Sequence, residues 1–304
     1  MKKYRLIFAM LICLPVLSAW AGQWTYDSGS AELSHDTSGW VLAASRNGTN
    51  LTVTGVSQSP DTPSALPLSD LIPGYALVSI GDWAFYDCTS LDFVTIPGSV
   101  THIGDGTFGS CTSLATVHIP DSVTSIGDSA FSYCSTLISV IIPDSVTSIG
   151  SYAFWDCSVL ASVTIGNSVT NIGDSAFWDC SALTSVLFTG DAPAFGFEAF
   201  ASTPATIYYL PGSTGWSTTF GGRPTLLWNP TIQHDASFGF APDGFCFNIY
   251  GTANIPVIVE ACTNLSCCVW TPLLTNSLDS SGALYFTDSS STGHPARFYR
   301  IVWP

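Results

Sequence analysis

Five cysteines recur at a constant spacing of 23 residues, and the residues around them recur with them. The repeated pattern is Ile-Gly-x-x-Ala-Phe-x-x-Cys-x-x-Leu-x-x-Val-x-Ile-Pro. A fixed period of roughly 20–29 residues, with apolar positions tied to it, indicates a solenoid. One such unit cannot bury its own apolar face, so the copies must stack and share a continuous core. The cysteines are Cys88, Cys111, Cys134, Cys157 and Cys180, and the copies begin at Ile80, Ile103, Ile126, Ile149 and Ile172.

Each repeat is predicted to hold two short strands and one helical turn. Alternating apolar residues predict a strand over Leu91–Ile96, and Pro97 should end it because proline has no N–H for a ladder. Val100–Ile103 should form the second strand. Asp105 should then act as the N-cap of a helical turn that carries Phe108. We expect the repeated leucines and phenylalanines to be buried, namely Leu91, Leu114, Leu137, Leu160, Leu183, Phe85, Phe108, Phe131, Phe154 and Phe177.

The repeated pattern resembles the BspA-like leucine-rich repeat family, and the resemblance covers about half of the chain. The departures are small: Gly106-Thr107 in the second copy and Gly166-Asn167 in the fourth. The resemblance implies a leucine-rich repeat solenoid. The family is found on bacterial and some protist surfaces, where several members look like adhesins for host matrix proteins or other cells. It has no shared catalytic residues, so it assigns none here.

Residues 1–21 have the features of a secretory signal peptide. Three basic residues precede an apolar run over Leu6–Leu17, and small residues around Ala21 offer a cleavage site. The run is too short to span a bilayer, and we expect no transmembrane segment elsewhere. The mature protein is therefore predicted to be secreted or held at the cell surface.

The rest of the chain is expected to form three parts. Residues 22–78, in which Trp40–Leu42 and Leu51–Val56 alternate like strands, should cap the solenoid, because terminal units of solenoids are atypical. Residues 79–222 should form the repeats. Residues 229–304 hold six short apolar stretches between Gly, Pro, Asn and Ser turns, which favours a small β-sandwich. The predicted fold class is a strand-dominated α/β leucine-rich repeat solenoid followed by a small all-β sandwich.

The charge distribution limits the possible partners. Without residues 1–21 the chain has no lysine and four arginines against 22 acidic residues, a net charge of −18. The five repeats contain no lysine or arginine. A nucleic-acid backbone would be repelled along the whole solenoid, and an anionic membrane surface is disfavoured for the same reason. We therefore expect a neutral or basic partner and no nucleic acid.

The cysteines form two sets. Stacking would bring the five repeat cysteines near the strand spacing of ~4.8 Å, which disulfide geometry does not forbid. An odd number leaves one unpaired, and free cysteine is a common small core residue, so we expect buried, reduced thiols. Four cysteines near the C-terminus allow three pairings, and the sequence leaves these open: Cys246, Cys262, Cys267 and Cys268.

No catalytic, cofactor or metal site is predicted. Ca²⁺ needs about six to eight oxygen ligands, whereas N-capping accounts for each repeat aspartate without a metal. The histidines show no zinc-ligand spacing. A glycan-active solenoid enzyme, the least favoured alternative, would need two carboxylates at one defined separation. The acids of the repeats are instead periodic: Asp82, Asp105, Asp128 and Asp174, with Ser151 in the place of a fifth.

Aromatic side chains at variable positions beside the repeated Ala-Phe are the candidate ligand contacts. Such rings bind sugars and anchor protein contacts, but large rings also pack between neighbouring coils, and the sequence leaves both roles open. The residues are Trp83, Tyr86, Tyr152, Trp155 and Trp178.

These features predict a non-catalytic extracellular binding or adhesion protein that presents its repeat face to a protein partner. The alternative is a carbohydrate-binding surface protein that uses the exposed tryptophans and tyrosines, above all Trp155 and Trp178.

Overall fold

The computed structural model describes residues 24–28, 30–35, 41–58, 64–66, 68, 75–265, 269–294 and 296–303. The chain divides into two compact units, one within Gly22–Trp228 and the other within Asn229–Pro304. The predicted signal peptide, Cys267 and Cys268 lie outside the described residues. Within the described residues, no helix is long and apolar enough to cross a membrane.

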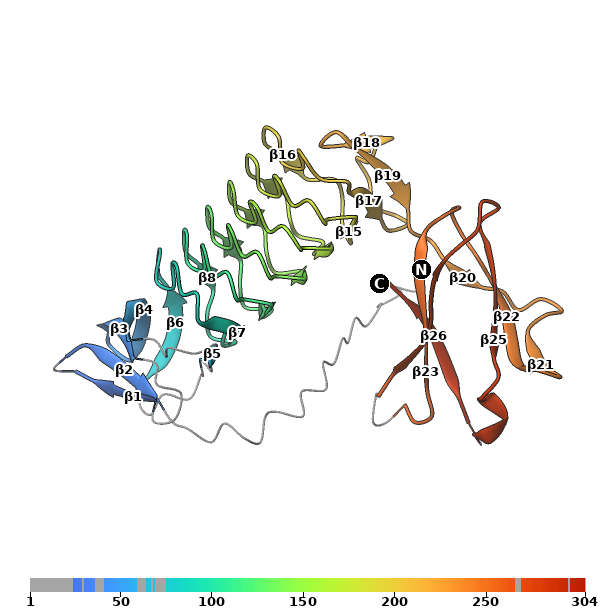
Figure 1. The fold of residues 1–304 in the computed structure, drawn as a ribbon, viewed down its shortest axis with the longest axis horizontal. Helices are drawn as coiled ribbons and strands as arrows, with labels where there is room; N and C mark the ends of the chain where they lie inside the picture. Colours follow the sequence, from blue (N-terminus) through green and yellow to red (C-terminus); the bar gives the residue numbers. More distant parts are fainter. Residues whose placement is uncertain are drawn as a thin grey trace. The chain divides into compact units, whose positions relative to one another are not determined.

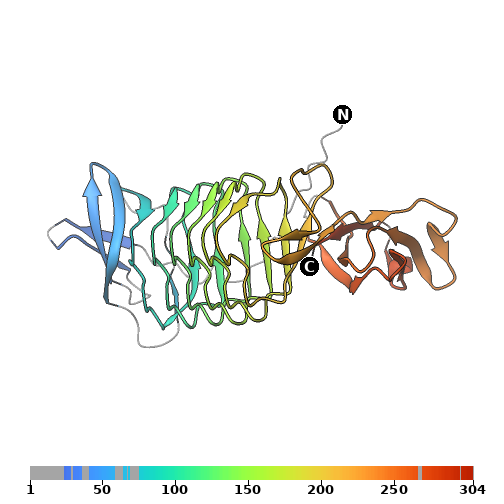
Figure 2. The ribbon, with the colours of Figure 1, turned by 90° about the horizontal axis from the view of Figure 1, so that it is seen from above.

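The first unit is a solenoid whose coils lie side by side in chain order (Figures 1 and 2). In coils 2 to 6 a two-residue strand leads through a turn segment to a strand of three or four residues, and in coil 1 both strands have five residues. We call the two sets the short strands and the longer strands. The short strands are β6 (Ala76–Ile80), β8 (His102–Ile103), β10 (Ser125–Ile126), β12 (Ser148–Ile149), β14 (Asn171–Ile172) and β16 (Ala194–Phe195). The longer strands are β7 (Leu91–Thr95), β9 (Thr116–His118), β11 (Ser139–Ile142), β13 (Ser162–Ile165), β15 (Ser185–Phe188) and β17 (Thr206–Tyr209). We number the coils 1 to 6 by their first residues, Ile80, Ile103, Ile126, Ile149, Ile172 and Phe195, which pair in register along the ladder.

The core consists of columns of identical residues. The phenylalanine of each turn segment, from Phe85 to Phe200, stacks on its neighbour at ring-centroid distances of 5.1–5.4 Å. All ten leucines and phenylalanines that the sequence places inward are 0% exposed, which confirms that prediction. The strand-dominated solenoid with a 23-residue period is confirmed as well.

The predicted helical turn is wrong. Residues 82–87 form successive tight turns, in which Trp83 and Asp87 have left-handed φ angles of 59° and 58°. The same two positions are left-handed in the following coils. Alternate N–H groups of the segment donate to the next coil, as Trp83 N does to the Asp105 carbonyl at 2.7 Å. An α-helix would use these donors within itself, whereas stacking provides carbonyls on the neighbouring coil, and these bonds offset a backbone cost of about 1–3 kcal/mol per left-handed residue.

Small polar side chains also connect the coils. Ser122 Oγ donates to the Val100 carbonyl at 2.6 Å, and Cys134 Sγ donates to the Phe108 carbonyl at 3.2 Å. The equivalent thiols of coils 2, 4 and 5 make the same bond. These four cysteines are buried and free, as expected, while Cys88 of coil 1 is half-buried. Burial raises the pKa of the Cys134 thiol to about 12 and that of Cys88 to about 11.

Antiparallel strands extend the short-strand ladder before coil 1. They are β1 (Trp24–Asp27), β2 (Glu32–His35), β3 (Val41–Asn47) and β4 (Asn50–Gln58). Strand β4 then pairs with β6 in parallel, and β5 (Ser64–Leu66) pairs with β7. Leu42, Leu51 and Val53 are fully buried and belong to the same core as the coils. The apolar end of the stack is thereby covered.

A hairpin covers the other end. Strand β19 (Arg223–Leu227) pairs in parallel with β17 and antiparallel with β18 (Thr219–Phe220). Phe220 is 6% exposed and packs against Phe188 and Phe200. The parallel ladder of longer strands therefore continues to Leu227.

The second unit holds two small antiparallel sheets, as the sequence predicts. One sheet contains β20 (Thr231–Ile232), β21 (Gly239–Ala241), β22 (Gly244–Tyr250) and β25 (Ala283–Asp288). The other contains β23 (Pro256–Cys262), β24 (Thr271–Ser277) and β26 (Phe298–Val302), and a single 3-10 turn, η1, spans Ser291–Gly293. Alternate residues of β23 from Val257 to Ala261 are buried, as are Phe247 and Ile249 of β22, and these side chains form part of the core of the unit.

Candidate ligand-binding surface

The predicted ligand contacts lie on the turn segments, where each coil has three positions that vary between coils. In coil 1 these positions are Trp83, Tyr86 and Asp87. The residues between them, Ala84 and Phe85, are buried and repeat along the solenoid. The variable side chains are therefore carried on a backbone that the core holds in the same conformation in successive coils.

Trp83 and Tyr86 form a pair at the start of the stack. They are 55% and 49% exposed, and their rings meet edge to face at 5.2 Å. Both rings lie over glycines of coil 2. A Cβ at Gly106 would collide with the Trp83 indole, and one at Gly109 would lie 3.0 Å from the Tyr86 ring. The two glycines of coil 2 thus leave space for the aromatic pair of coil 1.

A second group, which we call the aromatic cluster, lies on coils 3 to 5 and comprises Tyr133, Tyr152, Trp155 and Trp178. The Trp155 ring centroid is 4.6 Å from that of Tyr133, 5.6 Å from that of Tyr152 and 5.6 Å from that of Trp178. The two indoles are parallel within 4°. Tyr133 and Tyr152 are 37% and 39% exposed, and the tryptophans are half-buried. The rings therefore pack between coils and still present an outer surface.

The five predicted residues thus fall into two groups instead of one continuous surface. Ser129 and Ser132 occupy the equivalent positions in coil 3, after the two glycines of coil 2. Tyr133, which contacts Trp155 from the preceding coil, was not among the predicted ligand contacts. The signal for it was available, because Tyr133 occupies the variable position directly before the repeat cysteine.

Two carboxylates flank the aromatic cluster. Asp156 follows Trp155 and is half-buried, and Asp179 follows Trp178 and is exposed. Burial, and then the charge of Asp179, raises the pKa of Asp156. The pKa of Tyr133 is raised by burial and then by the charge of Asp156. The cluster is therefore an aromatic surface with a negative potential.

The column of repeat aspartates has a structural role, but a different one from that expected. Asp105 Oδ1 accepts a hydrogen bond from the backbone N–H of Asp128, 23 residues later, at 2.8 Å. The carboxylate caps the next coil and not a helical turn of its own. A Cβ at Gly127 would lie 2.5 Å from Asp105 Oδ1, which explains the Ile-Gly-Asp sequence of the repeat. Among the residues that the structure describes, no three His, Cys, Asp or Glu side chains gather to hold a metal.

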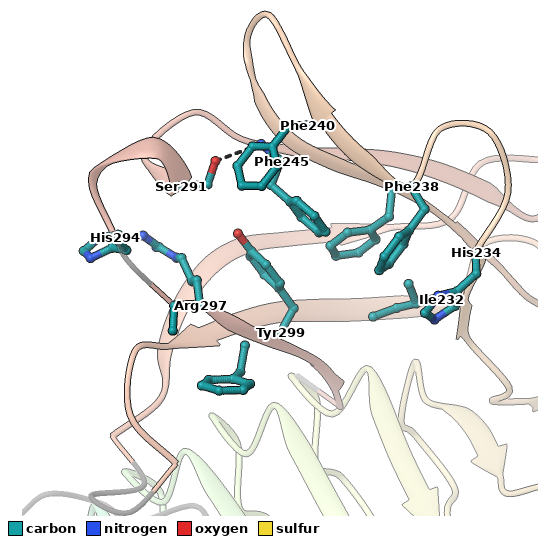
Figure 3. A pocket seen from close by; sticks show the side chains of 12 residues that line it. Ile232, His234, Phe238, Phe240, Phe245, Ser291, His294, Arg297 and Tyr299 are labelled. Carbon is teal, nitrogen blue, oxygen red and sulfur yellow. Dashed lines mark hydrogen bonds between the residues drawn. The ribbon is translucent and has the colours of Figure 1, made fainter.

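The second unit contains a concave site that no sequence motif indicated (Figure 3). Its volume is about 480 Å³. One end is formed by Phe238, Phe240 and neighbouring apolar residues, and the other includes Arg297 and Tyr299.

The polar end of this pocket is paired within the protein. Asp288 Oδ2 lies 2.8 Å from Arg297 Nε and accepts a 2.9 Å hydrogen bond from Tyr299. Burial alone would raise the pKa of Asp288, but hydrogen bonds from Ser290 and Tyr299, with the Arg297 charge, leave it below its usual value. The same buried carboxylate raises the pKa of Tyr299, after the larger effect of burial. These groups fix the loop between β25 and β26.

Six copies of the BspA type leucine rich repeat region match residues 78–206, the coils on which both aromatic groups lie. The repeat region belongs to the BspA-type leucine-rich repeat family. This is a family of repeat proteins, and no catalytic family is indicated for the chain. Comparison with curated protein sequences found no significant match.

Solved structures of bacterial leucine-rich repeat proteins are similar to parts of this chain. The leucine-rich repeat protein of T. pallidum is 27% identical, with a TM-score of 0.46 over 56% of this chain and 84% of that one. A leucine-rich repeat protein from Bacteroides capillosus ATCC 29799 is 28% identical, with a TM-score of 0.35; the match covers 42% of this chain and 94% of that one. A leucine-rich cell surface protein from Faecalibacterium prausnitzii A2-165 is 22% identical, with a TM-score of 0.27; the match covers 60% of this chain and 75% of that one.

Proposed function

We propose that this BspA-type repeat protein is a non-catalytic extracellular binding protein whose turn segments contact a neutral or basic protein partner. The contacts are made by the aromatic cluster and by the Trp83–Tyr86 pair. Export rests on the signal-peptide features of residues 1–21, which precede a chain with a net charge of −18.

The observation that carries this proposal is that folding does not require aromatic residues at these positions. Gly106 and Ser129 occupy the Trp83 position in coils 2 and 3, with the same left-handed backbone. The phenylalanine beneath them is the same and fully buried in all three coils, as Phe85, Phe108 and Phe131. Exposed aromatic residues at positions that glycine or serine can fill support a role in contacting a partner, where such side chains commonly dominate the binding energy.

A glycan is the second candidate, and the parallel Trp155–Trp178 rings favour it. Stacked indoles offer flat apolar faces of the kind that sugars contact. The two candidates differ in their response to salt. Association with a basic protein should slow as ionic strength rises, because surface electrostatics act mainly on the on-rate and are screened. Binding of a neutral glycan should be almost independent of salt.

The proposal is tested with the mature chain on a panel of extracellular matrix proteins and on a glycan array. Tyr133→Ala and Tyr152→Ala should weaken binding, because both rings are exposed. Ile141→Ala is the matched control, since Ile141 is 49% exposed but lies on strand β11. Clean negatives on both arrays, or equal losses in all three variants, would remove the proposal. Fractionation of the native cell tests the extracellular location independently.

A further inference from the structure

The surface over coils 3 to 5 combines two features that single out one type of side chain. In the aromatic cluster, the centroids of three rings lie within 5.6 Å of the Trp155 ring centroid. Asp156 and Asp179 follow the two tryptophans directly and are close enough for the charge of one to raise the pKa of the other. Aromatic faces and carboxylates both attract cations.

The coils that carry this surface contain no lysine or arginine. No lysine or arginine occurs between Arg46 and Arg223. In the described part of the chain, the ion pairs are Arg297 with Asp288 and Arg300 with Glu260, both in the second unit. Among the described residues, neither carboxylate of coils 4 and 5 takes part in an ion pair, so no cation of the solenoid offsets the repulsion between them.

We infer that the aromatic cluster, with Asp156 and Asp179, binds a lysine or arginine side chain from the protein partner. This inference rests on the proposed function and names the chemistry that the surface recognises. The alkyl stem of the residue would lie along the rings, and its charged end would meet the carboxylates.

Other ligands suit the site less well. A neutral sugar could stack on the rings but would leave the repulsion between Asp156 and Asp179 unchanged. A metal ion such as Ca²⁺ needs about six to eight oxygen ligands, and among the described residues no third acidic side chain joins these two in a metal-binding group. A long cationic side chain satisfies both the rings and the carboxylates.

The test uses the mature chain and short Gly/Ser peptides with one central lysine, arginine or acetyl-lysine, titrated by NMR. The lysine and arginine peptides should bind, and acetylation should weaken binding about tenfold, in line with a desolvated cation–π contact. The Asp156→Asn/Asp179→Asn double variant should lose a similar factor. Asp121→Asn is the control: Asp121 is an exposed carboxylate on the turn that follows β9, and its removal should change affinity less than about twofold, as expected for a screened surface charge.

Each result has a defined meaning. The inference would be overturned if Asp121→Asn lost as much peptide affinity as either single variant, Asp156→Asn or Asp179→Asn. Such a result would show diffuse attraction to an acidic protein. Equal affinity for lysine and acetyl-lysine would do the same. Capture of a partner or a neutral glycan that depends on Tyr152 but not on Asp156 and Asp179 would overturn the inference and leave the surface a binding site. A partner whose capture is insensitive to Tyr133 and Tyr152 would instead contradict the proposed function.

Discussion

The two units of this protein use their polar residues in opposite ways. In the solenoid, neutral or acidic side chains repeat every 23 residues and bond to the adjacent coil, as Ser122 and Asp105 do. In the second unit, two arginines hold single, non-repeated positions: Arg297 beside Asp288, and Arg300 beside Glu260 and over the Trp270 ring. Repetition separates structural from functional positions in the solenoid, because a position that changes between coils is not needed by the fold. The second unit offers no such internal comparison.

The largest effect should come from removing a core leucine of the solenoid. Leu137→Ala should cost about 2–5 kcal/mol in the free energy of unfolding, because the residue is fully buried between coils. Ile138→Ala is the adjacent control, 56% exposed. Denaturant melts with hydrogen exchange by mass spectrometry should place the loss in Gly22–Trp228. A loss below about 1 kcal/mol would mean that the inward register is wrong.

Adding one methyl group between coils should also be costly. In Gly127→Ala the new Cβ would meet Asp105 Oδ1 at 2.5 Å and the Asp105 backbone N at 2.7 Å, so we expect a loss of about 3 kcal/mol, as for an overpacked core. Gly55→Ala in β4 is the control, because no atom lies within 4 Å of its new Cβ. Similar thermal melts for the two variants would contradict close contact between coils.

The second unit should depend on pH through Asp288. Its folded-state pKa is depressed, so its contribution is present above the unfolded pKa of about 3.9 and is lost as the pH falls through the folded value. Asp288→Asn should destabilise this unit by about 2 kcal/mol at neutral pH, the range for hydrogen bonds to a charged group, and should flatten its acid dependence. Hydrogen exchange in β25 and β26 reports the change, with exposed Asp243→Asn as the control. An unchanged acid profile would show that the Asp288 contacts contribute no stability.

The smallest effect concerns the reactivity of the repeat thiols and leaves stability unchanged. The pKa values of about 11 for Cys88 and about 12 for Cys134 leave roughly one thiolate in a thousand or fewer at pH 8, and the thiolate is the reactive form. Peptide mass spectrometry after alkylation of the native protein should find Cys134 unmodified and half-buried Cys88 modified slowly. Both should react after unfolding. Rapid native labelling of Cys134 would show that the coils open.

The sequence predicted the inward columns because their spacing repeats without error through Leu91, Leu114 and Leu137. It did not predict the form of the turn segment. A local reading assigns Asp105 to a helix cap, since it cannot include a donor 23 residues away on the next coil. The Phe238–Tyr299 pocket was missed for a related reason, because its residues come from distant strands without a shared period.

Alternate donors of each turn segment bond to the following coil, and the donors between them bond within their own segment, so that all are satisfied within one 23-residue step. A whole repeat can therefore be gained or lost without leaving a donor or an acceptor unmatched, provided that the terminal strands remain. The number of coils becomes a variable that unequal recombination can change at low cost to folding. The distance between the Trp83–Tyr86 pair and the aromatic cluster could thus evolve separately from the chemistry of these two surfaces.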